Sequence, residues 1–297
     1  MFETLNGDSV KIARAYMDSL LIEGRVIGAG YPSTETMFFG EKFETPIMTA
    51  ALSHLKCEFG NGMALLAEGA KKAGAAACIG MSELPELRMV LETGARVIRI
   101  IKPYDDPKEI RDRIELCEKM GAMAVGMDLE HAAEVSSAEN STVLGFPMKQ
   151  VTMDELKEYV SGTKLPFVVK GVLSVHDAVR CAEAGCKGIV LSHHNGMLRW
   201  AVPPIMALGE IRKAVGKDML IILDGGIENG YDAFKALALG ADAVSVGRAL
   251  MPPLEKNGSD GVKDKLLAMN NELKAAMLRT DSKDVYSIDP AVIRRVY

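Results

Sequence analysis

The sequence predicts an α/β protein with the (β/α)₈ fold, a TIM barrel. Short apolar segments of β type alternate with helical segments from residue 46 onward, which is typical of parallel strands joined by crossover helices. Eight such segments favour a closed barrel over an open, doubly wound sheet, although the periodicity alone fits both. The expected strands are residues 46–52, 75–80, 96–101, 123–129, 166–172, 188–194, 219–225 and 243–250.

The whole chain, residues 1–297, is interpreted as one domain. An N-terminal helix is expected at 8–22, and a short hairpin at 37–46 would cap the lower end of the barrel. Several helical stretches open with Asp, Ser or Pro and close at Gly, as helix ends prefer. A last helix is expected at 262–280. We divide the chain into an N-terminal helix and cap (1–45), the barrel (46–280) and a C-terminal tail (281–297).

The composition excludes several classes of protein. The formal net charge is −5 and no long Lys/Arg run occurs, so the attraction on which non-specific nucleic-acid binding depends is missing. No stretch approaches the roughly 18–20 apolar residues of a membrane span, and the N-terminus lacks the pattern of a secretory signal. We therefore expect a soluble, cytoplasmic protein with a small-molecule substrate and neither a nucleic-acid nor a membrane partner. An odd set of five cysteines without CxxC spacing indicates buried, reduced thiols.

The sharpest chemical pattern follows the seventh and eighth strands. In barrels the working groups lie at the C-terminal strand ends, and a phosphate site is frequently built by the last two loops. The segments LDGGIENG and VGRAL place Gly225, Gly226 and Gly247 there, where backbone N–H groups can approach an anion, and add the cationic fork of Arg248. The alternative, two ordinary turns with Arg248 on a solvated rim, does not explain why the glycines follow adjacent strands.

A lysine and two histidines end the fifth and sixth strands. Lys170 lies among valines, so it requires a partner: an ion pair with Asp128 or Asp224, or an electron-accepting or anionic group in the site. Successive strand residues point to opposite faces, so only one of His193 and His194 is expected to enter the site. A strand-end histidine beside a carboxylate such as Asp128 can act as a general base.

The remaining histidines and one long loop complete the pattern. His54, His131 and His176 are expected to have surface roles, and no histidine pair has zinc-like spacing with acids, so no metal site is predicted. Residues 130–150 form a polar insertion after the fourth strand. Loops of this length are functional lids or disordered, and this one leaves from the strand end where barrel sites are built. Lys102 is a further charged residue at a strand end.

Two segments carry a resemblance to a known family. VVKGVLSVHDAVRCAEAGCKGIVLSHHNG and LDGGIENGYDAFKALALGADAVSVGRALM resemble the FMN-dependent α-hydroxy-acid dehydrogenases and oxidases, which include glycolate oxidase and lactate oxidase. The likeness is strongest over residues 165–251 and extends more weakly back to PIMTAA at residue 46. It implies a flavoprotein oxidoreductase with FMN as cofactor.

The resemblance also implies roles for single residues. His194 matches the base that removes a proton from the substrate, Asp128 the carboxylate that orients it, and Lys170 the lysine that stabilises the reduced flavin. The implied flavin contacts are Thr49, Ala50, Lys170, Ser192, Asp224, Gly225, Gly226, Gly247 and Arg248.

The chain departs from the family where the substrate binds. The arginine that clamps the substrate carboxylate is replaced by Met197, and a thioether cannot supply a planar fork. Arg199, two residues later, is retained with His194 as a candidate substrate contact. The glutamine and tyrosine of strand three fall at Arg99–Ile101, and the strand-four threonine becomes Gly126. Glu228 replaces the arginine after the two glycines.

Three functions remain open from the sequence. The first is oxidation of a small 2-hydroxy acid, with a histidine base and the flavin as electron acceptor. The second is an FMN-dependent isomerase similar to type 2 isopentenyl diphosphate isomerase, and the third is a flavin-binding barrel without turnover. The resemblance also implies a homo-oligomer, a tetramer or an octamer.

Overall fold

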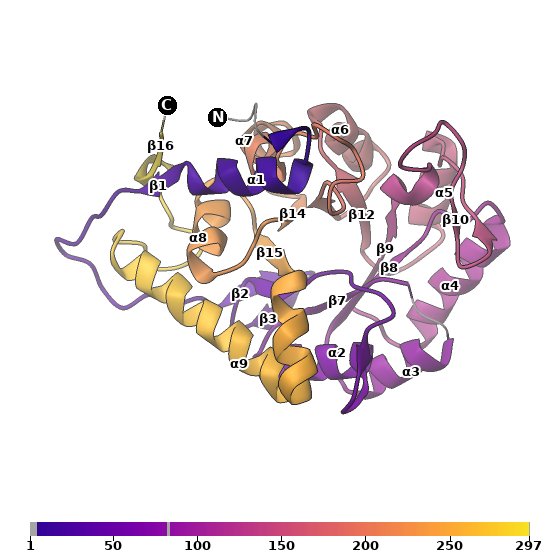
Figure 1. The fold of residues 1–297 in the computed structure, drawn as a ribbon, viewed down its shortest axis with the longest axis horizontal. Coiled ribbons are helices and arrows are strands. Elements are labelled where there is room, and N and C mark those ends of the chain that lie inside the picture. The colour runs from indigo at the N-terminus through magenta and orange to yellow at the C-terminus, as the bar shows by residue number, and fades with distance from the viewer. Residues whose placement is uncertain (1–4, 82–83, 297) are drawn as a thin grey trace.

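The central sheet has the eight parallel strands that the sequence predicts. The computed structural model describes residues 5–81 and 84–296 (Figure 1). The strands follow one another around the sheet in the order β4-β15-β14-β13-β12-β9-β8-β7. Their bounds are β4 Ile47–Thr49, β7 Ala77–Ile79, β8 Val97–Ile101, β9 Ala124–Asp128, β12 Phe167–Val172, β13 Gly188–Leu191, β14 Leu220–Asp224 and β15 Ala243–Val246.

The barrel closes between β4 and β7, largely through a side chain. The Thr49 hydroxyl donates to the carbonyl of Cys78 at 3.0 Å and accepts from the Cys78 N–H at 2.9 Å. A bridge between Leu52 and Ile79 continues the contact toward the C-terminal end of the strands. The open-sheet alternative is therefore wrong, because the two end strands meet.

Helices surround the barrel and begin at capping residues. The side chains of Asp106, Thr152, Ser174 and Asn229 each accept a hydrogen bond from a backbone N–H in the first turn of a helix, as helix starts require. The helix bounds are α2 Gly62–Lys72, α3 Leu84–Glu92, α4 Pro107–Lys119, α5 Met153–Ser161, α6 Val175–Glu183, α7 Pro204–Val215, α8 Gly230–Ala238 and α9 Met251–Leu278.

Two apolar clusters hold the layers together. The larger one lies between the sheet and the helices, and the smaller one fills the barrel interior with residues such as Met48, Ile98 and Ile222. Phe38 and Phe43 belong to the interior cluster and come from the hairpin of β2 (Thr36–Phe38) and β3 (Glu41–Phe43). The predicted hairpin is confirmed, and its two rings cover one end of the interior.

Within residues 5–296, an N-terminal and a C-terminal segment meet beside the barrel. Helix α1 (Ser9–Asp18) is capped by the Asp8 carboxylate. Strand β1 (Leu20–Ile22) pairs with β16 (Ile293–Arg295), which belongs to the predicted C-terminal tail. The short 3-10 helix η4 (Pro290–Val292) directly precedes β16. In Figure 1, α1 lies along the top of the view, with β14 below it and the pair of β1 and β16 beyond one of its ends.

The insertion after β9 is ordered. It contains the 3-10 helix η2 (Leu129–Ala132) and a small hairpin of β10 (Thr142–Val143) and β11 (Phe146–Pro147). Another small hairpin, β5 (Lys56–Cys57) with β6 (Gly60–Asn61), precedes α2. All five cysteines are free thiols, and four of them are buried, as expected.

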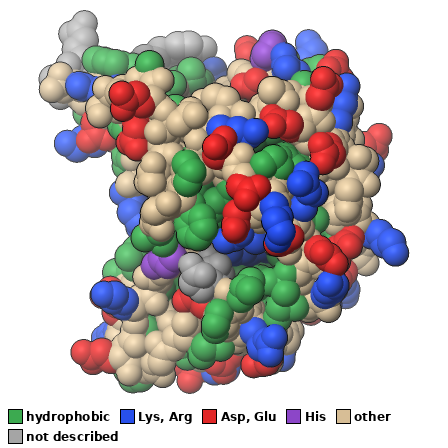
Figure 2. Space-filling model, turned by 90° about the vertical axis from the view of Figure 1, so that its right-hand side faces the viewer, with side chains coloured by type: hydrophobic (Ala, Val, Ile, Leu, Met, Phe, Trp, Pro, Cys, Tyr) green, Lys and Arg blue, Asp and Glu red, His purple; other side chains and the backbone are tan. Residues whose placement is uncertain are grey.

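The surface carries mixed charge. On the face in Figure 2, acidic and basic side chains are interspersed, and no extended patch of one sign is visible there. Among the helices within residues 5–81 and 84–296, none is long and apolar enough to cross a bilayer.

Candidate active site

The C-terminal strand ends open into one large cavity. Its volume is about 800 Å³, and it is lined by most of the residues that the sequence singled out. Thr49, Asp128 and Ser192 are buried and do not line the cavity. Arg199 is also outside the lining, and its guanidinium donates to the carbonyl of Asn6. The predicted residues in the wall are Ala50, Lys170, His193, His194, Asp224, Gly225, Gly226, Gly247 and Arg248.

One end of the cavity has the features of an anion cradle. Gly225 and Gly226 have φ angles of 95° and 79°, which glycine adopts without strain. A Cβ on Gly226 would meet no atom within 4 Å, so this backbone faces open space. Gly247 begins the short helix η3 (Arg248–Leu250), which leads directly into α9. Glycine backbone, a helix start and the exposed Arg248 fit a phosphate group.

The loop of the two glycines is held by the N-terminal helix. Arg14 of α1 donates to the carbonyl of Gly226 at 2.9 Å and forms a bidentate pair with the buried carboxylate of Asp232. Asp232 also accepts from the backbone N–H of Glu228. No local pattern in the sequence marked Arg14, because Gly226 and Asp232 lie more than 200 residues away from it.

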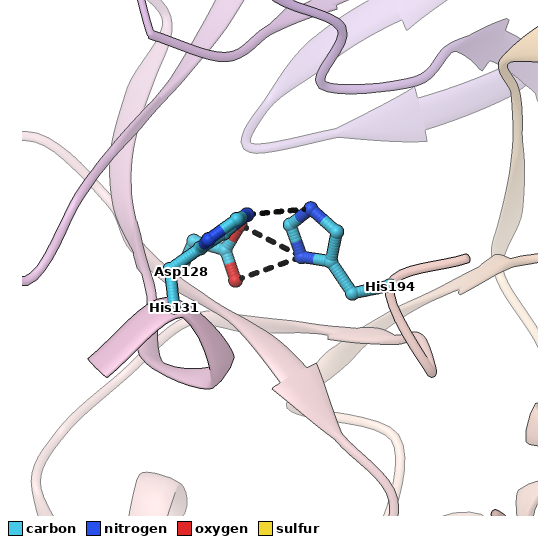
Figure 3. Close-up of side chains that lie close together, drawn as sticks. All are labelled: Asp128, His131 and His194. Carbon is cyan, nitrogen blue, oxygen red and sulfur yellow. Dashed lines mark hydrogen bonds and ion pairs between the residues drawn. The ribbon is translucent and has the colours of Figure 1, made fainter. Parts of the chain in front are cut away.

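His194 also lines the cavity, and a buried carboxylate lies against its imidazole. Asp128 ends β9, and its Oδ2 lies 3.0 Å from Nδ1 of His194 (Figure 3). Burial alone would raise the pKa of Asp128, but Lys170, His194 and Lys102 outweigh burial and hold that pKa well below its usual range. The carboxylate is therefore ionised and keeps a proton on the facing ring nitrogen.

Two buried lysines face the same carboxylate oxygen. Lys102 Nζ lies 3.0 Å and Lys170 Nζ 3.7 Å from Oδ2 of Asp128. Lys170 also lies 3.0 Å from Nδ1 of His194 and 3.4 Å from the Ser192 hydroxyl. The ion pair of Lys170 with Asp128 is thus present, and Lys170 still lines the cavity. Lys102 follows directly after β8, which ends with Arg99–Ile101, and its side chain extends from the end of this strand into the cluster.

Ser192 and Asp224 connect the two ends. The Ser192 hydroxyl donates to Asp224 at 2.8 Å and accepts from the backbone N–H of His194 at 3.0 Å. The Ser245 hydroxyl donates to the other oxygen of Asp224 at 2.9 Å. This network fixes the end of β13 against β14 and leaves Asp224 facing the cavity.

His193 and His194 both line the cavity, so the expectation that only one would enter is wrong. Strand β13 ends at Leu191, and His194 has a φ of 43°. The alternation of strand side chains therefore stops before these residues. His193 lies against Gly225, where a Cβ would come within 3.5 Å of its ring.

His131 is a site residue, which corrects its expected surface role. Its Nε2 lies 2.8 Å from Nε2 of His194, with the two rings nearly perpendicular (Figure 3). Burial, together with the nearby Lys102, lowers the pKa of His131 to about 3, so this ring is neutral. His54 and His176 are exposed, as expected.

Glu130, the residue before His131, adds a second carboxyl group. Among the residues that the structure describes, its Oε2 is buried without a hydrogen-bond partner, and it lies 3.9 Å from Nδ1 of His194. Burial raises the pKa of Glu130 to about 8. A protonated carboxyl and a neutral imidazole thus come from the insertion, where no periodicity in the sequence marked them.

Asp128, His131 and His194 offer three ligand atoms within 4.8 Å of one another. Such a set can hold a divalent cation. However, the ammonium groups of Lys102 and Lys170 already face the same carboxylate and oppose a second positive charge. We therefore assign the cluster to proton handling, and the absence of a metal stays a prediction.

The fold and the cavity define a class: a barrel enzyme that holds a phosphate-bearing cofactor beside a histidine-carboxylate pair. The chain matches the FMN-dependent dehydrogenase family over residues 5–148 and 130–295, and it belongs to that family. It is thus an FMN-dependent oxidoreductase.

Individual relatives agree with this assignment. The chain is 30% identical to 4-hydroxymandelate oxidase of Amycolatopsis orientalis, over 82% of this chain and 78% of the relative. It is 29% identical to L-lactate oxidase of Lactobacillus jensenii, over 89% of this chain and 72% of the relative. The structure of mandelate oxidase with benzoyl-formic acid superposes with a TM-score of 0.87 at 27% identity, covering 98% of this chain and 90% of that one.

Proposed function

We propose that this protein oxidises a small 2-hydroxy acid, with His194 as the base that takes a proton from the substrate. The observation that carries the proposal is that His194, paired with the buried Asp128, lines the same cavity as the glycine cradle. FMN, when bound, supplies the electron acceptor for the substrate's electron pair. Similarity to oxidases of mandelate and lactate supports this substrate class.

The residues that hold FMN are proposed from the cavity wall. Gly225, Gly226, Gly247 and Arg248 would bind the phosphate, and Asp224 would face the chain that joins it to the ring. Lys170 would lie beside the ring and place a positive charge there. Ala50 would contact the ring edge, whereas Thr49 and Ser192 would act from behind the wall.

The proton step depends on the two nitrogens of His194. Asp128 holds a proton on Nδ1, so Nε2 is the nitrogen that accepts the substrate proton. The ionised Asp128 then stabilises the charged ring. Because His131 contacts the same Nε2, an entering substrate must displace this hydrogen bond.

The cations available to a substrate carboxylate differ from those in other members of the family, because Met197 replaces the arginine that binds this group. Met197 offers no charge, and Arg199 can reach a substrate only if its guanidinium leaves Asn6. We propose Arg199 and His194 as substrate contacts on this basis. An isomerase remains the second candidate, because the missing arginine removes a carboxylate clamp.

The test is anaerobic reduction of the purified yellow protein. We expect loss of the flavin colour with at least one acid in a panel that contains glycolate, lactate and mandelate. His194→Gln should keep the bound flavin and slow this reduction by about 10²–10⁴-fold, the usual contribution of a general base. Retained colour across the panel, with conversion of a diphosphate substrate only after prior reduction, would instead support the isomerase. Equal rates for His194→Gln and the parent protein would reject the base.

We further propose a cytoplasmic homo-oligomer, a tetramer or an octamer. Free, mostly buried thiols fit a reducing compartment, and the assembly rests on the family likeness. Light scattering coupled to size-exclusion chromatography tests the assembly, and a monomeric mass would reject it.

A further inference from the structure

We propose that Lys265, on helix α9, is a phosphate-binding residue of this cofactor site. The inference rests on the placement of the FMN phosphate proposed above. Lys265 lines the cavity beside Glu228, and its Nζ donates to the carbonyl of Glu228 at 3.0 Å. An ammonium group has three N–H donors, so two remain for a ligand.

The other cations at this end have partners of their own. Arg14 is paired with Asp18 and Asp232 and is used to hold the loop. Lys11 is mostly exposed and lies 3.4 Å from Asp8. Within residues 5–81 and 84–296, neither Arg248 nor Lys265 forms an ion pair. These two side chains are therefore the cations available to an anion.

The charge of the ligand calls for more than one cation. A phosphate monoester carries a charge of about −1.5 to −2 at neutral pH. Glu228 brings an exposed carboxylate to the same loop, which opposes the anion. Lys265 donates to the backbone of this loop and so brings a positive charge to it, whereas Arg248 follows the neighbouring strand β15.

The packing of helix α9 determines where Lys265 lies. Helix α9 is broken at Asn257 and Gly258, whose φ/ψ angles are not helical, and its longer second part runs beside α8 (Figure 1). The start of α8 approaches this part so closely that a Cβ on Gly230 would lie 2.1 Å from a backbone oxygen of Met269. The helix backbone that carries Lys265 is thus held against α8, and the ammonium contacts the loop through its hydrogen bond to Glu228.

The experiment compares FMN with riboflavin, which lacks the phosphate. Each is titrated into protein stripped of flavin, and the two Kd values are read from the change in flavin fluorescence. We expect Lys265→Met to raise the Kd for FMN by about tenfold, equal to about 1.4 kcal/mol. The Kd for riboflavin should change less than twofold. Lys265→Arg should keep the preference for FMN.

Two matched variants make the outcome decisive. Lys274→Met removes the same charge from an exposed position of α9 outside the cavity and should leave both Kd values unchanged. Arg248→Met should also reduce the preference for FMN. A reduced preference in Arg248→Met with none in Lys265→Met would overturn the role of Lys265 and keep the phosphate position. A parent protein that binds both flavins equally would overturn both.

Discussion

Glu130 shows how a single buried acid makes the stability of this barrel depend on pH. Its pKa is raised to about 8 in the folded protein by burial, against about 4.5 in an unfolded chain. Between these values the folded state binds more protons than the unfolded chain. The free energy of unfolding therefore falls as the pH rises through this window, because unfolding releases the proton that the folded state holds, and a higher pH favours that release.

We predict that Glu130→Gln removes this contribution to the pH dependence of the free energy of unfolding. The free energy of unfolding of the parent protein should fall more steeply than that of the variant between about pH 5 and 8, by at most about 1.4 kcal/mol per pH unit. At pH 8 the variant should be the more stable protein. Denaturant unfolding of both proteins at several pH values checks this, with the exposed Glu134→Gln as control. Parallel curves for Glu130→Gln and the parent protein would contradict the raised pKa.

The residues that the sequence could predict all lie at strand ends. The rule that barrel sites form there identified Asp128, Lys170 and His194 without any knowledge of contacts. The rule did not identify Glu130 and His131, because their approach to His194 depends on the 3-10 helix η2, which has no periodic pattern in the sequence. The rule did not identify Lys265 for a different reason: this residue lies in the helix α9, whose sequence has an ordinary amphipathic pattern.

At the level of elements, the insertion after β9 is ordered by an aromatic contact. Phe146 of β11 lies edge-on to Tyr104, with ring centroids 5.5 Å apart, and the guanidinium of Arg113 lies over both rings. Met148 continues the contact through a bridge to Tyr104. The hairpin is thereby fastened to the segment that joins β8 to α4, and the insertion presents His131 from a fixed position.

We predict that Phe146→Ala loosens the insertion without affecting the cofactor. Loss of the ring contact should remove about 0.5–1.5 kcal/mol of local stability in addition to the loss of buried area. Limited proteolysis within residues 133–145 should become faster, and flavin reduction by substrate should slow. The affinity for FMN should not change. Leu144→Ala, an exposed residue of the same hairpin, is the control. Unchanged proteolysis in Phe146→Ala would show that the insertion is held by other contacts.

The sequence predicted where the strands and helices lie along the chain more accurately than it predicted their shapes. All eight strands overlap their predicted segments, because each carries its own apolar pattern. The last helix was expected at 262–280, yet α9 begins at Met251 and turns at Asn257 and Gly258. That turn depends on the packing of two helix parts against different neighbours, which no local pattern records.

For the whole molecule, closure of the barrel is the property that periodicity could not show. Open and closed sheets share the same alternation, and the difference here lies in the seam of β4 and β7. At this seam the Thr49 hydroxyl serves both the N–H and the carbonyl of Cys78, and Thr49 is fully buried. A side chain thus replaces part of a strand ladder, and it does so next to the cavity wall at Ala50.

We predict that Thr49→Val weakens the closed barrel. Valine keeps the shape and the β-branched stiffness of threonine but leaves the two polar groups of Cys78 without their partner. Each buried group left unpaired costs about 1–3 kcal/mol, so Tm should fall on the order of 5 °C, and the amide of Cys78 should exchange faster with deuterium. Thr49→Ser keeps the hydroxyl and should exchange as slowly as the parent protein. If valine and threonine give the same Tm and the same exchange rate, the seam is held by the apolar contacts of β4 and β7, and the hydroxyl is dispensable.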